Sequence, residues 1–426
     1  MSHRSARRTL LSVALLPLLL AAACGGSPPA EPEPAATDAI AYEGARIIVG
    51  DGTVLDSGTL LVEQDRLLAV GPSNAVTVPD GAERVDLSGR TVMPAIIDTH
   101  VHLREDEREP LIEDLQRKAY YGVGAVLSLG RGVSNVAFDL QASPVGGAAD
   151  YHTVGRGITA PEPGRTEVPS WITTEEEARA AVRELGTQDV EMVKIWVDDR
   201  GDQFDKLTPE LYGAVIDEAH IQGLKVTAHV YSLEDAKGLL EAGIDAFAHG
   251  IRDMDVDEDV VAMFEDRPHV VLVPNLPGAG VATDLGWVSG TIPADQLNEM
   301  QARSVDQPDA QEAFGIQARN LNRLNEAGVT IAFGTDGGAG WSPHAEMEDM
   351  VRAGMSPAEV LVAATANSAN LLGLDDQGTL QAGKRADFVV LEANPLDNIT
   401  NTRSIVDVYL RGEALDRASL SAAWVN

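Results

Sequence analysis

The sequence predicts an α/β protein in which a (β/α)8 TIM barrel carries a small β-sandwich domain formed by both chain ends. Two observations support this prediction. From Thr91 to about residue 373, short apolar segments alternate with amphipathic helical patterns, as in βα units around a parallel sheet. On both sides of this region, short β-type segments lie between turn signals such as Gly50-Asp51-Gly52. The length of 426 residues suits one large barrel with an appended domain.

The composition excludes several classes of protein. The chain has 32 Lys and Arg against 66 Asp and Glu, a net charge of −34, so we expect no nucleic-acid partner, because such binding depends on clustered cationic side chains. The single cysteine, Cys24, excludes an intramolecular disulfide and a zinc site built from cysteines. A hydrophobic fraction of 44% is sufficient for a packed core, so the chain as a whole is not disordered.

Residues 1–23 have the pattern of a signal peptide. Arg4, Arg7 and Arg8 precede the apolar run 9–20, and three alanines lead into Cys24. The pattern resembles a bacterial lipoprotein signal, in which Cys24 becomes the lipid-modified first residue of the mature chain. We therefore expect an exported protein, lipid-anchored to the cell envelope on its periplasmic or outer surface. Cleavage after the alanines without lipidation, giving a soluble periplasmic protein, is the alternative.

The segments that follow predict a tether and a divided β domain. Residues 24–38 contain four prolines among Gly, Ser, Ala and Glu, a composition that predicts an extended tether. Residues 39–90 predict the N-terminal part of the β-sandwich, with strands bounded by Gly and Pro turns. Residues 374–426 contain β-type segments at 387–391 and 405–410, and we expect them to complete the same domain.

Residues 91–373 predict the barrel. Thr174, with Glu177 three residues later, predicts the start of a helix at 174–185, and Gly223 predicts the end of another at 209–222. The eight predicted strands are 92–97, 125–129, 153–157, 192–197, 225–228, 246–248, 270–273 and 330–333. Because active sites of such barrels lie at the C-terminal ends of the strands, the residues there are the candidates for chemistry.

Metal-binding side chains gather at those strand ends. His100 and His102 end the first predicted strand, and extended backbone directs residues two apart to the same side. The other candidates are Lys194, His229, His249 and Asp336, in or after the fourth, fifth, sixth and eighth strands. A single strand-end histidine is usually a core residue, and a single strand lysine usually reaches solvent. Six such side chains at one end of a barrel are better explained by a metal site.

This set of residues resembles the amidohydrolase superfamily. The segments Met192-Val193-Lys194-Ile195 and Ala248-His249-Gly250 most resemble its branch of Xaa-Pro dipeptidases (prolidases) and imidazolonepropionase-like proteins, and residues 378–390 are similar to the family segment that joins barrel and sandwich. The resemblance implies two divalent metal ions, Zn2+ being the expected metal, bridged by Lys194 after its carboxylation by CO2. His100, His102 and Asp336 would hold one ion, and His229 and His249 the other, although some relatives use a single metal.

The chemistry of these groups agrees with that implication. Burial favours the neutral form of an amine, which can add CO2 to become an anionic bridge. A water between two metal ions is deprotonated near neutral pH, and the metal-bridging hydroxide would attack a polarised carbonyl. Asp336 would accept the water's proton and deliver it to the leaving amine. We therefore expect hydrolysis of an amide or peptide bond in a small-molecule substrate, such as an Xaa-Pro dipeptide or an N-acyl amino acid.

Three further residues are candidates for substrate binding. Tyr231 lies two residues beyond His229 and should face the same cavity, although packing at the rim is equally compatible. Arg165 follows the third strand, and its guanidinium suits bidentate pairing with a carboxylate. Arg252 follows His249 and could meet a charged substrate group or form a surface ion pair. The Gly-, Pro- and polar-rich segment 275–309 predicts a substrate lid.

Two other functions remain open at this stage. An esterase, lactonase or phosphotriester hydrolase could use the same binuclear site. A non-catalytic, lipid-anchored binding protein could keep the barrel without the chemistry, although the complete ligand set favours an enzyme. In every case we expect contact with the membrane only through Cys24, and a homo-oligomer is compatible with the sequence.

Overall fold

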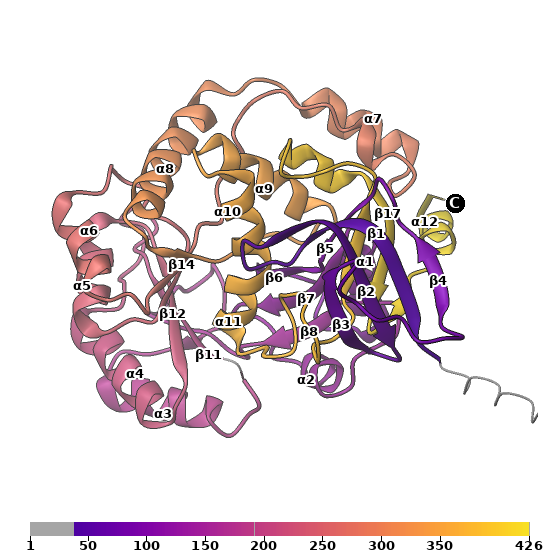
Figure 1. The fold of residues 1–426 in the computed structure, drawn as a ribbon. Coiled ribbons are helices and arrows are strands. Elements are labelled where there is room, and N and C mark those ends of the chain that lie inside the picture. The colour runs from indigo at the N-terminus through magenta and orange to yellow at the C-terminus, as the bar shows by residue number, and fades with distance from the viewer. Residues whose placement is uncertain (1–37, 191, 426) are drawn as a thin grey trace, which may run out of the picture. The chain divides into compact units, whose positions relative to one another are not determined.

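The computed structural model describes residues 38–190 and 192–425, which belong to one compact unit (Figure 1). The predicted signal peptide, the tether up to residue 37 and the lipid site at Cys24 lie outside the described residues. Among the described residues, no helix combines the length and the apolar character that crossing a membrane requires.

Parallel strands form the central part of the fold. A three-stranded sheet has the order β6-β7-β8, and a seven-stranded sheet has the order β10-β9-β11-β12-β13-β14-β15, with all pairs parallel. The strands are β6 (Ile96–Val101), β7 (Val123–Ser128), β8 (Asp150–Thr153), β9 (Ile158–Thr159), β10 (Ser170–Trp171), β11 (Met192–Val197), β12 (Lys225–Val230), β13 (Ala246–Ala248), β14 (Val271–Val273) and β15 (Thr330–Ile331).

Backbone hydrogen bonds connect the two parallel sheets on both sides. The Thr99 N–H donates to the Phe333 carbonyl at 2.9 Å, which joins β6 to the chain after β15. The Gly157 N–H donates to the Gly130 carbonyl at 3.1 Å, which joins the chain after β7 to the chain before β9. The arrangement is the one expected for a TIM-barrel type of fold, and it directs the C-terminal ends of the strands to one side.

Helices follow most of these strands, and Figure 1 shows α3 to α6 along the outer side of β11 to β14. The helices are α1 (Arg108–Tyr120), α2 (Asn135–Ala142), α3 (Glu175–Leu185), α4 (Pro209–Ile221), α5 (Leu233–Ala242), α6 (Glu258–Glu265), α7 (Ala294–Arg303), α8 (Pro308–Glu326), α9 (Ser342–Arg352), α10 (Pro357–Val362), a π-helical turn (Ala363–Asn367) and α11 (Ser368–Leu372). The predicted start of α3 is confirmed, because Thr174 and Glu177 form a reciprocal capping box.

Strands from both ends of the chain form one further sheet of eight strands, and the predicted β-sandwich domain itself stays a prediction. Its order is β18-β17-β16-β5-β1-β2-β3, with β4 also pairing with β1. These strands are β1 (Ile40–Ile48), β2 (Val54–Glu63), β3 (Arg66–Pro72), β4 (Glu83–Asp86), β5 (Thr91–Pro94), β16 (Phe388–Leu391), β17 (Ile405–Leu410) and β18 (Glu413–Ala414). The sheet has its own core, where the Tyr42 ring lies 5.2 Å from Phe388 and 5.1 Å from Tyr409.

The structure corrects two predicted strands. The predicted segment 92–97 covers two strands: β5 pairs with β1 and β16 in the eight-stranded sheet, and the barrel strand β6 begins only at Ile96. Pro94 ends β5, and the chain changes sheets within a run of buried residues that has no polar interruption. The predicted strand 153–157 is β8 at Asp150–Thr153, because Gly155 has a φ of 65° and ends the extended backbone.

Two segments differ from a simple loop or strand. The predicted lid, residues 275–309, contains a 3-10 turn (Gly286–Val288) and helix α7. The C-terminal end forms helix α12 (Arg417–Val425), which the sequence did not predict. Its Trp424 ring lies 5.5 Å from that of Tyr120 and 4.4 Å from the Arg117 guanidinium, so the helix packs on α1.

Candidate active site

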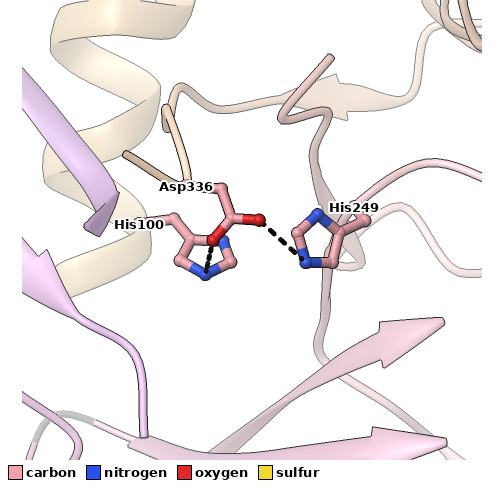
Figure 2. Close-up of side chains that lie close together, drawn as sticks. All are labelled: His100, His249 and Asp336. Carbon is pink, nitrogen blue, oxygen red and sulfur yellow. Dashed lines mark ion pairs between the residues drawn. The ribbon is translucent and has the colours of Figure 1, made fainter. Parts of the chain in front are cut away.

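Three of the predicted ligands meet at the C-terminal ends of the parallel strands. Figure 2 shows the carboxylate of Asp336 between the rings of His100 and His249. The His100 Nε2 atom lies 3.2 Å from Oδ1 of Asp336, and the His249 Nε2 atom lies 3.7 Å from Oδ2. One ligand atom from each of the three residues lies within 4.8 Å of the others, a spacing that could hold a metal ion.

His102 adds a third imidazole to the same carboxylate. Its Nε2 atom lies 3.0 Å from Oδ1 of Asp336, and its ring centre lies 5.2 Å from that of His100. Burial alone would raise the pKa of Asp336, but the hydrogen bond with His102 and the nearby His100 hold it well below its usual range. Asp336 is therefore ionised at neutral pH.

The histidine rings are available as ligands. Burial holds the pKa of His100 and of His249 well below the ordinary value, so both rings are neutral at pH 7. The Nδ1 atom of His100 lies 2.9 Å from Oδ1 of Asn275, an acceptor, which assigns the ring proton to Nδ1. The Nε2 lone pair of His100 then faces Asp336 and the shared space. The Nδ1 atoms of His102 and His249 are buried and have no hydrogen-bond partner among the described residues.

Lys194 lies in β11 and is 1% exposed. Its Nζ atom has no hydrogen-bond partner among the described residues. Burial lowers the pKa of Lys194 to about 7, with Asp336 opposing the shift and the guanidinium groups of Arg252 and Arg200 reinforcing it. A substantial fraction of this amine is therefore neutral near pH 7, which is the nucleophilic form.

His229 lies next to the group but makes different contacts. Its ring centre is 4.6 Å from that of His249, yet its Nε2 atom lies 2.8 Å from Oδ2 of Asp198 and 3.1 Å from Nη1 of Arg200. Burial lowers the pKa of His229 to about 4. The structure therefore brings His100, His102, His249 and Asp336 together, and it leaves His229 paired with Asp198 and Arg200.

The predicted substrate-binding residues have distinct surroundings. Tyr231 is 47% exposed, and its carbonyl accepts a hydrogen bond from the Arg252 N–H at 2.8 Å. The Arg252 Nε atom is buried and has no hydrogen-bond partner among the described residues. Burial lowers the pKa of Arg252. Arg165 donates to Oε2 of Glu162 at 2.5 Å, so its guanidinium already has a carboxylate partner.

His344 lies outside the group. Its Nδ1 and Nε2 atoms lie 3.0 Å from the Thr402 hydroxyl and 3.1 Å from the Tyr121 carbonyl. It connects α9 to the C-terminal segment and therefore has a structural role.

Several residues of the site were missed in the sequence. Asp198 and Arg200 follow β11, so the strand-end criterion that identified the histidines could have found them. Asn275 follows β14 in the same way. The loop that carries Glu162 gave no comparable signal, because it has no periodic pattern.

Backbone strain is concentrated at this site. Seven non-glycine residues of the described chain have a positive φ, and four of them belong to the site. These four are Arg200 (58°), His249 (149°), Asn275 (42°) and Asp336 (52°). Such conformations cost about 1–3 kcal/mol each and persist where the surroundings enforce them, as at active sites.

The donor atoms suit a divalent metal ion. Three imidazole nitrogens and one carboxylate are the ligands that zinc and similar ions prefer. The buried Lys194 Nζ atom, which has no partner among the described residues, lies in the same group of interacting charges. The residues present therefore fit the metal site that the sequence predicts.

The pattern of the Amidohydrolase family matches residues 91–415. The chain belongs to the amidohydrolase family. An imidazolonepropionase from Deinococcus radiodurans is 26% identical over 403 residues, 86% of this chain and 94% of that protein. A candidate prolidase from Bifidobacterium longum has 29% sequence identity and a TM-score of 0.74, over 91% of this chain and 98% of that chain.

A second solved structure agrees in fold. A Xaa-Pro dipeptidase with bound methionine has a TM-score of 0.71 at 21% identity, over 88% of this chain and 99% of that chain. The predicted family and the TIM-barrel type of fold are thus confirmed. The protein is an amidohydrolase-family enzyme, a hydrolase that acts on carbon–nitrogen bonds.

Proposed function

We propose that this amidohydrolase cleaves the amide or peptide bond of a small substrate, such as an Xaa-Pro dipeptide or an N-acyl amino acid. The observation that carries the proposal is the convergence of three imidazole Nε2 atoms on the Asp336 carboxylate, beside a buried lysine without a partner among the described residues. The similarity to a candidate prolidase and to an imidazolonepropionase supports an amide or peptide substrate.

Two divalent metal ions, with Zn2+ as the expected metal, would complete the site. His100, His102 and Asp336 would hold one ion, His229 and His249 the other, and Lys194 would bridge them as a carbamate formed with CO2. Binding at His229 requires its Nε2 atom to exchange the contacts with Asp198 and Arg200 for the metal. When bound, the ions would acidify a water and polarise the scissile carbonyl.

Side chains of the protein then transfer the proton and orient the metal-binding histidines. Asp336 is ionised at neutral pH, so its carboxylate can accept a proton from the attacking water and pass it to the leaving nitrogen. The Asn275 side chain fixes the ring of His100 through Nδ1. The neutral rings keep their lone pairs for metal ions over the whole neutral range.

Metal analysis and a substrate screen test the proposal. We expect about two metals per chain, and a carbamate signal assigned to Lys194 when the protein is loaded in 13C-labelled bicarbonate. A library of dipeptides and N-acyl amino acids should contain substrates, and Asp336→Asn should abolish their turnover without changing the far-UV circular dichroism. Hydrolysis of matched esters or phosphotriesters without any amide would refute amide specificity and support the alternative enzyme.

We also propose that the protein is exported and lipid-anchored through Cys24. The support is the basic and apolar pattern of residues 4–20 immediately before the single cysteine of the chain. Full-length protein grown with a labelled fatty acid should incorporate the label, and Cys24→Ser should not. Unlabelled wild-type protein released in soluble form would contradict the anchor.

A further inference from the structure

A cavity of about 290 Å³ adjoins the proposed metal-binding group, that is, His100, His102, His249 and Asp336. His102 forms part of its wall, and the Nε2 atom of His102 lies 3.0 Å from the Asp336 carboxylate, so a molecule in the cavity would reach the proposed reaction centre. Arg131, Glu162, Arg165 and Trp196 form most of the remaining wall.

The wall has an excess of positive charge. Glu162 is buried and lies between two guanidinium groups, with Arg165 at 2.5 Å and Arg200 at 3.0 Å. Arg200 in turn lies 2.6 Å from Asp198. The guanidinium of Arg131 is exposed and has no hydrogen-bond or ion-pair partner among the described residues, so its charge is not compensated.

This excess contrasts with the chain as a whole, in which acidic residues outnumber basic ones by 66 to 32. The positive charge of Arg131 and Arg165 on this wall is therefore a local feature of the cavity. A planar guanidinium binds a carboxylate through two parallel hydrogen bonds, and such charge-assisted bonds are among the strongest that proteins form.

One side of the cavity is a fixed aromatic surface. Trp196 is partly exposed, and glycines pack against its ring: a Cβ added at Gly157 would lie 2.2 Å from the ring, and one added at Gly130 would lie 2.4 Å from it. Glycine at both positions lets the backbone contact the indole, which holds the ring in place. An aromatic wall of this kind suits an aliphatic side chain or a pyrrolidine ring.

We infer that the cavity binds the free α-carboxylate of the substrate, with Arg131 as its main anchor and Arg165 as the second. The inference rests on the proposed function and specifies its substrate class: amides whose leaving amino acid keeps a free carboxylate. Arg131 is then a specificity-determining residue. Neutral amides, esters and phosphotriesters lack the group that it would bind.

Binding measurements on the metal-loaded enzyme test this inference without requiring turnover. Calorimetry compares two pairs of probes in which a methylene amine replaces the scissile amide, so that they cannot be hydrolysed: the reduced analogue of Ala-Pro with its C-terminal carboxamide, and N-ethyl-L-alanine with N-ethyl-L-alaninamide. The carboxylate probe of each pair should bind the wild type about 10-fold to 100-fold more tightly, because a hydrogen bond to a charged group is replaced by one to a neutral group. Arg131→Met should remove this preference, and Arg131→Lys should retain part of it.

Arg303→Met provides the matched control, because Arg303 is an exposed arginine of α7 outside the cavity. It should keep the full preference. Equal binding of carboxylate and carboxamide by the wild type, or an unchanged preference in Arg131→Met, would overturn the inference. Preference for carboxylates without hydrolysis of any amide in the library would instead contradict the proposed reaction and leave the carboxylate site standing.

Kinetics separate binding from catalysis once a substrate is found. Arg131→Met should raise KM for the carboxylate substrate about 10-fold or more and change kcat much less, since Arg131 does not contact the metal-binding group. A large fall in kcat at unchanged KM would refute the assigned role.

Discussion

Lys118 and Asp98 form an ion pair in the interior, and removing its positive charge should strongly destabilise the protein. The Lys118 Nζ atom lies 2.8 Å from Oδ2 of Asp98, and both side chains are 0% exposed. Asp98 also accepts hydrogen bonds from the Thr335 N–H at 3.0 Å and from its hydroxyl at 2.8 Å. The pair therefore joins β6 and α1 to the loop that carries Asp336. The perturbation is Lys118→Met, which keeps an unbranched side chain and removes the charge.

The expected magnitude follows from burial. Removing one member of a buried ion pair leaves an uncompensated charge and costs about 3–5 kcal/mol. Arg303→Met is the exposed control, because its pair with Glu299 has side chains that are 80% and 70% exposed, and such pairs contribute less than about 1 kcal/mol. The double variant Asp98→Asn with Lys118→Met removes both charges and keeps an oxygen that can accept from Thr335. It should recover most of the loss.

Urea unfolding followed by far-UV circular dichroism measures these differences. The protein should be metal-free, because a bound metal adds its binding free energy to the folded state. A loss below about 1 kcal/mol in Lys118→Met would refute the reasoning, because a buried carboxylate would then need no partner. Equal destabilisation of the single and double variants would refute it as well, since the loss would not come from an uncompensated charge.

Three further predictions concern separate parts of the structure. Thr174→Ala removes the capping box of α3 and should cost about 1 kcal/mol in the free energy of unfolding, and an unchanged urea midpoint would contradict this. Lys194 has a pKa of about 7 in the folded protein, below the unfolded value of about 10.4. Between about pH 7 and pH 10.4 the unfolded chain therefore binds more protons than the folded one, and the free energy of unfolding of metal-free, CO2-free protein should rise with pH. Lys194→Met should reduce that rise, and an identical pH profile would exclude the shift. Gly157→Ala should displace the Trp196 ring and weaken binding of carboxylate probes. Gly146→Ala is the control for an added methyl, because a Cβ there meets no atom within 4 Å and the backbone φ is not in the left-handed region.

The alternation of strands and helices was predictable from the sequence because it depends on local patterns. Buried parallel strands are short and apolar, and helices begin at capping residues such as Thr174, which can be recognised in the sequence. The change of sheet at Pro94 was not predictable in the same way. The chain is buried on both sides of it, and hydrophobicity does not reveal which neighbouring strand a segment pairs with. Helix α12 was missed because its tertiary contacts, with Trp424 on α1, have no counterpart in the local sequence.

The site was predictable to the extent that its residues follow strands. His100, His249 and Asp336 could be placed because strand ends in such a fold meet on one side. Their partners depend on distances between strands, which the sequence does not contain. The pairing of His229 with Asp198 and Arg200, and the contact between Glu162 and Arg165, required the folded structure. The roles assigned to the ligands stay predictions until metal is measured.

The charges around Lys194 help to explain why arginines lie so near a candidate metal site. Burial lowers the pKa of Lys194 most, and Arg252 and Arg200 lower it further, which means that their positive charges oppose an ammonium at that position. The same charges would stabilise an anion there, and a carbamate on Lys194 is an anion. Arg200 also contacts Asp198 and Glu162, so its charge is shared with two carboxylates rather than directed only at the metal-binding group. The arginines that disfavour an ammonium at this position would thus favour a carbamate there, and this is the electrostatic argument for the proposed bridge at Lys194.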